Sequence, residues 1–336
     1  MTSSPTGSTV LAIGSYTSAT GGRGQGITLV PRDPSSGRLG RPGHVADCAS
    51  PSFLATGAPG LVHAAHEVDE GFVSTRRYDG DRWELLGEQP SGGSSPCHLT
   101  VTPDVVLVAN YGGGVGVLGL TGGVVTGLRK TLHGNGSGPD RERQEASHPH
   151  STRLLAPDAF AVLDLGTDEV RVHTLGPDGA SPDPVQVVDL APGTGPRHAV
   201  VDAGRVHVAG ELDASVTSFT LQDGRLSDPV RTSALVGSVD EPVYPSEIAL
   251  APWGLVVANR RADVITLFEV VDGVPRAVRD VTIGAANPRH VLVIGHHVYV
   301  AAQDSDAVVH LTLDDDLTVV DRSVVEVGSP TYVLPL

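Results

Sequence analysis

Seven prolines open seven copies of one sequence pattern, and this repeat constrains the fold more than any other feature of the chain. The prolines are Pro51, Pro96, Pro149, Pro196, Pro245, Pro288 and Pro330. A short apolar run follows each proline, then a turn, a second apolar run such as residues 105–110, and an alternating run such as residues 115–118. A period of about 40–50 residues holding three or four strands is typical of a propeller blade. We therefore expect an all-β chain, a seven-bladed β-propeller of four-stranded blades.

The seventh copy of the pattern is incomplete, because residues 330–336 end the chain before a second strand can follow. A run of the missing kind stands near the other end, at residues 10–14. Pairing of the two would build the last blade from both termini and remove free sheet edges. An open solenoid is the alternative, and it would leave both ends unpaired. We expect one domain over residues 1–336, with no linkers.

Composition supports short strands and excludes some classes of partner. Glycine (41) and proline (25) are abundant and aromatic residues make up only 4% of the chain, which fits many strands joined by tight turns. The net charge of −16 argues against nucleic acid and against anionic membranes as partners. Residues 1–9 lack a signal-peptide pattern, and no apolar run is long enough to span a bilayer. We expect a cytoplasmic protein, either a monomer or a weak dimer.

The candidate functional residues follow the opening prolines or end the second strands. Because neighbouring strands in a blade are antiparallel, these two sets share one face. The first set comprises His98, His150, Arg197, His198, Glu247, Arg289 and His290; the second includes Asn110, Tyr111, Asp164, Glu211, Arg260, Arg261 and Gln303. Several arginines at one face of an acidic chain suit a carboxylate or phosphate ligand. The alternative is that they pair with acidic residues and tie the blades together.

The histidines suit acid–base chemistry better than metal binding. They occur about once per blade, without the close spacing of zinc motifs, although His148 and His150 form a close pair. Cys48 and Cys97 give neither a disulfide framework nor a zinc signature. We expect no metal and no cofactor, with histidine titrating near neutral pH. The long irregular stretch 133–147 is either a surface loop or a lid over a site.

A series of short motifs, kept in order along essentially the whole chain, resembles the propeller lactonase family. The motifs include Gly14-Ser15-Tyr16-Thr17, Asn110-Tyr111-Gly112-Gly113-Gly114, Glu142-Arg143-Gln144-Glu145, His148-Pro149-His150-Ser151, Asp164-Leu165-Gly166-Thr167-Asp168, Gly195-Pro196-Arg197-His198, Pro245-Ser246-Glu247-Ile248, Asn259-Arg260, Pro288-Arg289-His290 and Gln303-Asp304-Ser305-Asp306. This family is typified by bacterial 6-phosphogluconolactonase and includes a fungal-type carboxymuconate cyclase. One departure lies after the Asn-Arg pair, where the family has glycine and this chain has Arg261.

The resemblance implies a lactone hydrolase of the pentose phosphate pathway, with a small anionic lactone as substrate. It implies a catalytic set of His150, Arg197, Glu211 and Arg260. In that reading His150 or Glu211 is the general base, and Arg197 or Arg260 stabilises the oxyanion. Arg289 with His290 would hold a phosphate, and the full substrate-binding set is His98, Asn110, His148, His198, Glu247, Arg289, His290 and Gln303. The alternatives are a carboxymuconate-type cycloisomerase and a non-catalytic binding propeller. If Arg197 and Glu211 do chemistry, we expect them in one blade as a solvent-accessible pair.

Overall fold

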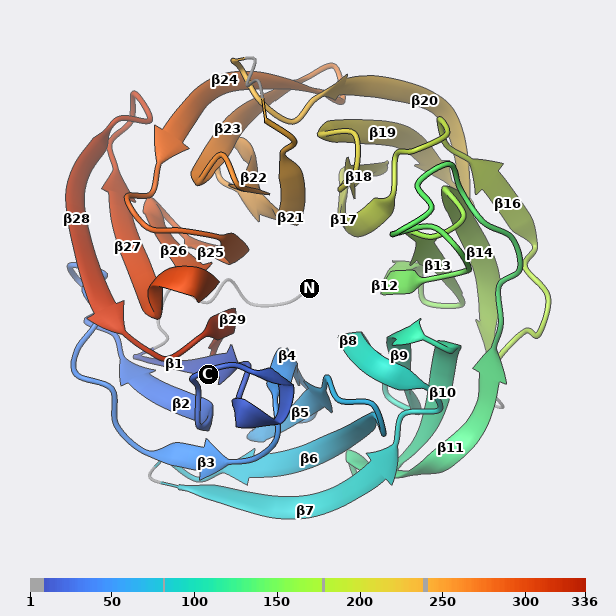
Figure 1. Ribbon diagram of the computed structural model, residues 1–336, viewed down its shortest axis with the longest axis horizontal. Helices are drawn as coiled ribbons and strands as arrows, with labels where there is room; N and C mark the ends of the chain where they lie inside the picture. The colour runs from blue at the N-terminus through green and yellow to red at the C-terminus, as the bar shows by residue number, and fades with distance from the viewer. Residues whose placement is uncertain (1–8, 81, 177–178, 238–240) are drawn as a thin grey trace. The chain divides into compact units, whose positions relative to one another are not determined.

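The computed structural model describes residues 9–80, 82–176, 179–237 and 241–336, and these residues form seven antiparallel sheets (Figure 1). Residues 1–8, on which the signal-peptide expectation rests, lie outside that range. The chain divides into two compact units. One unit comprises residues 53–232, and the other comprises residues 1–52 together with 233–336.

The unit of residues 53–232 contains four sheets whose strands follow one another in chain order. Their strands are β4 (Pro51–Thr56), β5 (Leu61–His66), β6 (Phe72–Tyr78) and β7 (Trp83–Pro90); β8 (Ser94–Val101), β9 (Val105–Gly112), β10 (Gly114–Thr121) and β11 (Val124–Leu132); β12 (Pro149–Ala156), β13 (Ala159–Asp164), β14 (Glu169–Gly176), β15 (Gly179–Ala180) and β16 (Gln186–Asp189); β17 (Pro196–Asp202), β18 (Arg205–Gly210), β19 (Ser215–Gln222) and β20 (Arg225–Ser233). Strands β15 and β16 both pair with β14. Every first strand begins at or just before one of the repeated prolines, as the sequence pattern predicts.

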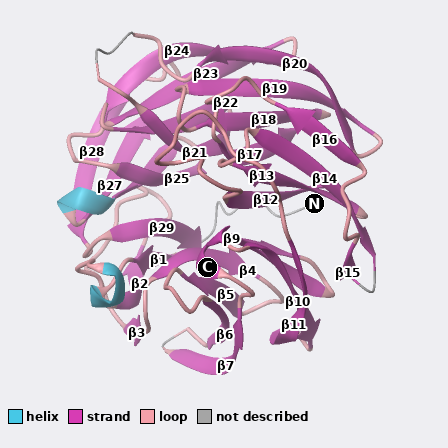
Figure 2. Ribbon diagram, turned by 45° about the vertical axis from the view of Figure 1, so that its right-hand side comes forward, coloured by secondary structure: helices cyan, strands magenta, loops and turns pink. Residues whose placement is uncertain are grey.

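The other unit contains three sheets. Their strands are β29 (Pro330–Pro335), β1 (Val10–Ser15), β2 (Gly26–Pro31) and β3 (Val45–Asp47); β21 (Tyr244–Ala251), β22 (Gly254–Arg260), β23 (Val264–Val271) and β24 (Val274–Thr282); β25 (Pro288–Ile294), β26 (His297–Ala302), β27 (Ala307–Leu313) and β28 (Val319–Glu326). Helix is confined, within the described residues, to the 3₁₀ turns η1 (Ser18–Thr20) and η2 (Gln303–Ser305) (Figure 2).

The terminal blade closes as predicted. Strand β1 lies antiparallel to β29, with Leu11 opposite Pro335 and Gly14 opposite Tyr332. Its other edge pairs with β2. The N-terminal and C-terminal segments therefore belong to one four-stranded sheet.

Burial changes across each sheet. The second strand is covered on both faces, so β5 and β13 are buried along their whole length, whereas the fourth strand β28 alternates between half-buried and exposed residues. Apolar side chains of neighbouring sheets pack together: Leu107 and Val115 lie in one cluster with Phe160. Full burial of such a side chain contributes about 1.5–3 kcal/mol to stability. This packing gives the strand ends a rigid base from which polar side chains project.

Candidate active site

A β-bulge follows the opening proline in at least five blades, and it sets the direction of the candidate side chains. Opposite β9, for example, Pro96 faces Asn110 but His98 faces Ala109, so Cys97 is the extra residue. His150, Ser246 and Arg289 are the extra residues at the same place in β12, β21 and β25. Between Pro196 and Ala199 the register also shifts, at Arg197 and His198. Because a bulge bends the strand and re-aims a side chain, the repeat delivers one functional position per blade.

A buried carboxylate shared by two arginines forms the centre of the site in residues 53–232. Glu211 directly follows β18, and its Oε2 lies 2.8 Å from Nε of Arg197 at the start of β17. Nη2 of Arg143 donates to Oε1 of the same carboxylate at 2.6 Å. Arg197 and Glu211 lie in one blade, as expected, but their side chains are only 3% and 1% exposed, so the expected solvent-accessible pair is instead a buried one.

Arg143 was absent from the residues chosen by sequence reasoning, and the stretch 133–147 carries it to the site. Asp140 Oδ1 accepts from the backbone N–H groups of Glu142 and Arg143. The buried amide of Gln144 donates to the Leu165 carbonyl and to Asp168 Oδ1, both at 2.8 Å. Asp168 also accepts from the backbone N–H groups of Gly193 and Gly195, just before Arg197. The loop is therefore fastened to the segment that leads into β17.

Gly166 permits this fastening. A Cβ atom at residue 166 would lie 1.8 Å from the carbonyl oxygen of Ala146 and 2.8 Å from the backbone nitrogen of His148. Neither backbone group can yield without moving the loop. Glycine is thus required where the 133–147 stretch passes closest to the turn after β13.

Aromatic and imidazole rings line the same strand ends. The rings of His98 and His198 lie 5.2 Å apart, and those of His150 and His198 lie 5.3 Å apart, both edge-on. Phe53 packs against His98 at 4.3 Å. These histidines are carried by β8, β12 and β17, and β12 contacts both of the other two strands (Figure 1). The Ser151 hydroxyl donates to the Arg197 carbonyl at 2.6 Å, so the residues after His150 and before His198 are joined directly.

Tyr111 joins the histidines to the charged group. Its ring stacks on His148 at 4.4 Å and meets His150 edge-on at 5.9 Å. Its hydroxyl accepts from Nε of Arg143 at 3.4 Å. Burial raises the pKa of Tyr111, although the adjacent Arg143 guanidinium lowers it. Burial opposes the charge of Arg143, but Glu211 and the hydrogen bond to Tyr111 outweigh it and raise the pKa of the guanidinium.

Three other predicted residues of this unit face the scaffold. The Asn110 amide donates to the carbonyls of Ser91, Val108 and Gly114, so it holds the Gly-rich turn between β9 and β10. His148 has Tyr111 O at 2.8 Å from Nδ1 and Glu145 Oε1 at 2.9 Å from Nε2. Asp164 pairs with Arg171 at 2.7 Å, which ties β13 to β14. This ion pair is structural, but it joins two strands of one blade rather than two blades.

The remaining predicted residues belong to the other unit. Glu247 Oε2 lies 3.6 Å from Nε2 of His290, and the ring of His290 packs on Tyr332 at 3.8 Å. Arg289 donates to the Tyr16 hydroxyl and lies 4.8 Å from the centre of that ring.

In the same unit, Arg260 ends β22, Arg261 follows it, and Gln303 begins η2. Nε of Arg260 donates to the Tyr244 carbonyl at 3.2 Å. Arg261 adopts a left-handed conformation (φ 68°), which explains why glycine suits this position, and its guanidinium lies 5.1 Å from the Tyr244 ring centre. Gln303 begins η2 and donates to Asp304.

Two further observations concern ligands and membranes. Across the described ranges, no three His, Cys, Asp or Glu side chains are grouped so that they could hold a metal ion. In the same ranges, no helix is long and apolar enough to cross a membrane.

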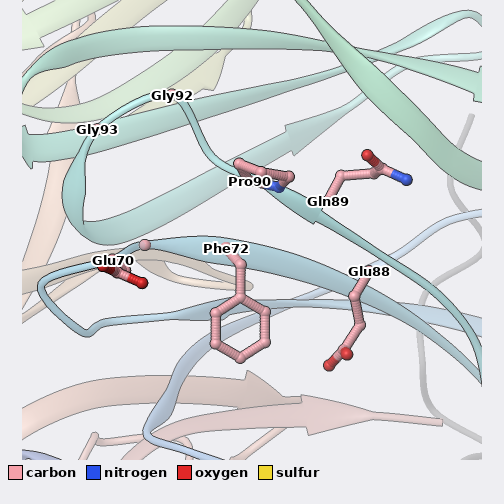
Figure 3. A pocket seen from close by; sticks show the side chains of 8 residues that line it. Glu70, Phe72, Glu88, Gln89, Pro90, Gly92 and Gly93 are labelled. Atoms are coloured by element: carbon pink, nitrogen blue, oxygen red, sulfur yellow. The ribbon is translucent and has the colours of Figure 1, made fainter.

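A hollow of about 500 Å³ lies beside β6 and the end of β7, lined by Phe72, Glu70, Glu88, Gln89 and Pro90 among others (Figure 3).

The repeated antiparallel sheets define the architecture of a β-propeller, and charged side chains gather at the strand ends. A family model described as lactonase, seven-bladed β-propeller, matches residues 10–335. The chain belongs to this lactonase family, and the predicted seven-bladed β-propeller fold is confirmed.

Individual relatives are distant but cover most of the chain. The periplasmic gluconolactonase of Pseudomonas aeruginosa is 26% identical, with a TM-score of 0.89 over 96% of this chain and 98% of that one. A Bacteroides fragilis protein, provisionally assigned as a 6-phosphogluconolactonase, is 25% identical, with a TM-score of 0.88 over 96% of both chains. A probable 6-phosphogluconolactonase of Arthroderma benhamiae is 27% identical over 71% of this chain and 65% of its own length.

Proposed function

We propose that this protein hydrolyses a sugar lactone, with 6-phosphogluconolactone as the preferred substrate. The observation that carries the proposal is the buried Glu211 carboxylate held between Arg197 and Arg143, with His150 on the neighbouring strand. Two guanidinium groups meet at one carboxylate, and guanidinium groups suit a developing oxyanion or an anionic substrate. Membership of the lactonase family and the names of the relatives support the same activity.

In the proposed reaction, water attacks the lactone carbonyl carbon while His150 accepts a proton from that water. The carbonyl oxygen becomes an oxyanion, which Arg197 stabilises. When the tetrahedral intermediate collapses, the bond to the ring oxygen breaks and the proton passes to that oxygen. The products are a hydroxyl group and a carboxylic acid. General base catalysis supplies about 10²–10⁴-fold, and one oxyanion donor about 3–4 kcal/mol of barrier reduction.

His150 suits the role of general base better than Glu211 does. Both oxygens of Glu211 already face guanidinium groups. Protonation of that carboxylate would leave Arg197 buried without its counter-charge, which is costly. We assign Glu211 to holding the two arginines in place. Arg260, which belongs to the other unit, remains a second proposed oxyanion donor.

Apart from Asn110, the other residues keep the roles proposed from the sequence. His98, His148, His198, Glu247, His290 and Gln303 are proposed to contact the substrate, and Arg289 with His290 remains a candidate for holding its phosphate. Asn110 is proposed only as the residue that shapes the turn beside the site, because its amide donates to three backbone carbonyls. Cytoplasmic localisation and a place in the pentose phosphate pathway belong to the same proposal.

A carboxymuconate cycloisomerase is the second candidate, since paired guanidinium groups recognise a carboxylate as well as a phosphate. The test is direct. Purified protein is mixed with freshly made 6-phosphogluconolactone, with gluconolactone, and with carboxymuconate, and each substrate is followed against its rate in buffer. Faster loss of the phosphorylated lactone supports the proposal. Turnover of carboxymuconate alone would replace it with the second candidate, and no turnover of any substrate would refute both.

A further inference from the structure

We infer that Arg143 recognises the anionic substituent of the substrate, and that the loop of residues 133–147 exists to present it. The inference rests on the proposed lactonase function and adds the residue that selects a phosphorylated sugar lactone over a neutral one. Arg143 lies outside the strands, in contrast to Arg197 and Arg289, which the blade repeat supplies.

Exposure separates Arg143 from the rest of the charged group. Its side chain is 35% exposed, whereas those of Arg197 and Glu211 are 3% and 1% exposed. An anion that approaches this group therefore meets Arg143 first. The substituent of the substrate can pair with Arg143 while Arg197 stays on Glu211.

The guanidinium of Arg143 has donors to spare. Its Nε donates to the Tyr111 hydroxyl and its Nη2 donates to Glu211. Within the described part of the chain, no residue accepts a hydrogen bond from its Nη1. A planar guanidinium fixed on one side and open on the other presents the fork that binds phosphate oxygens.

The group also has the charge that a phosphate requires. Arg143 and Arg197 both pair with the Glu211 carboxylate, which gathers two guanidinium groups at one place in a chain of net charge −16. Glu211 and Tyr111 raise the pKa of Arg143, which favours the charged guanidinium. A phosphate that binds there meets the full positive charge of the Arg143 guanidinium.

The loop is built to hold Arg143 rigidly. Asp140 accepts a hydrogen bond from the backbone N–H of Arg143, and Gln144, the next residue, donates to Asp168. Asp168 in turn fixes the segment before Arg197. Preorganisation of this kind reduces the cost of ordering a long side chain when a ligand binds.

The test compares Arg143→Met with Arg141→Met. Arg141 is an exposed arginine of the same loop and has no hydrogen bond or ion pair with a described residue, so it controls for loss of a charge. Arg143→Met should lower kcat/KM for 6-phosphogluconolactone about 10- to 100-fold, mainly through KM, as expected for loss of a charged hydrogen bond. The loss for unphosphorylated gluconolactone should be less than about threefold. Arg141→Met should match the wild type, and Arg143→Lys should recover part of the loss.

Three outcomes would overturn the inference. An equal loss on both lactones would make Arg143 a positioning residue, and normal kinetics of Arg143→Met would give it no role. If Arg289→Met loses the preference for the phosphorylated lactone and Arg143→Met keeps it, the residue that recognises the phosphate is Arg289.

A second measurement separates this inference from the proposed function. If the wild type hydrolyses neither lactone, the lactonase proposal fails, and inorganic phosphate then serves as the probe. Phosphate should raise the melting temperature of the wild type and of Arg141→Met but not that of Arg143→Met. Equal stabilisation of all three proteins, or of none, would refute Arg143 as an anion site.

Discussion

Three buried histidines predict a steep loss of stability in mild acid. His63, His207 and His310 are fully buried, and in each the Nδ1 atom faces a hydroxyl, of Thr75, Ser218 or Ser323 respectively. Burial lowers the pKa of each imidazole to about 4. An unfolded histidine titrates near about 6.5. Between these values the unfolded chain binds more protons, so stability is lost as the pH falls from about 6.5 towards 4.

The expected magnitude is large. A depression of about 2.5 pKa units corresponds to about 3.4 kcal/mol once the pH is below both values. At pH 5 each histidine lowers the free energy of unfolding by about 2 kcal/mol relative to neutral pH. For three such groups the sum is about 6 kcal/mol, comparable with the whole stability of an ordinary domain, about 5–15 kcal/mol.

The assay is urea unfolding at pH 7, 6 and 5, followed by circular dichroism. His207→Asn keeps a polar atom near the position of Nδ1 but cannot become charged. Its free energy of unfolding should fall by about 2 kcal/mol less than that of the wild type between pH 7 and pH 5. His44→Asn, which removes an exposed imidazole, is the control. Parallel pH profiles for the wild type and His207→Asn would refute the reasoning.

Three further predictions follow from the site and the fold. Glu211→Gln should lower turnover at least about 100-fold and also lower the melting temperature, because breaking a buried ion pair costs about 3–5 kcal/mol; unchanged turnover with a lowered melting temperature would make the pair purely structural. Lactonase activity should survive dialysis against EDTA, and loss on chelation with recovery on added calcium or zinc would contradict a metal-free mechanism. Deletion of residues 330–336 removes β29 and should lower the melting temperature markedly, since β1 then loses its partner; an unchanged melting curve would count against closure through the termini.

Most of the strand framework could be predicted from the sequence because each blade repeats one apolar pattern. The run predicted at residues 105–110 lies within β9 (Val105–Gly112), and that at residues 10–14 lies within β1 (Val10–Ser15). Pairing of the two ends of the chain followed from the incomplete seventh repeat. Such features depend on local alternation, and neighbouring blades reinforce it.

The site was harder to predict because its geometry depends on irregular backbone. A bulge adds one residue and breaks the alternation, so its effect on His150 cannot be read from a period of two. The position of Arg143 depends on Gln144 reaching Asp168, a contact distant in sequence. One signal was available: the Glu142-Arg143-Gln144-Glu145 motif stands in the longest irregular stretch of the chain. Burial of the Arg197–Glu211 pair had no such signal.

The pairing of β1 with β29 has a consequence for synthesis. Leu11 leaves the ribosome about 320 residues before its partner Pro335. At about 5–20 residues per second, the free edge of β1 waits on the order of tens of seconds for its partner. During that time Leu11, Ala12 and Ile13 offer an apolar strand to any other nascent chain. The pairing of β1 with β29 is therefore a long-range closure, and until it forms the open edge of β1 is exposed to aggregation.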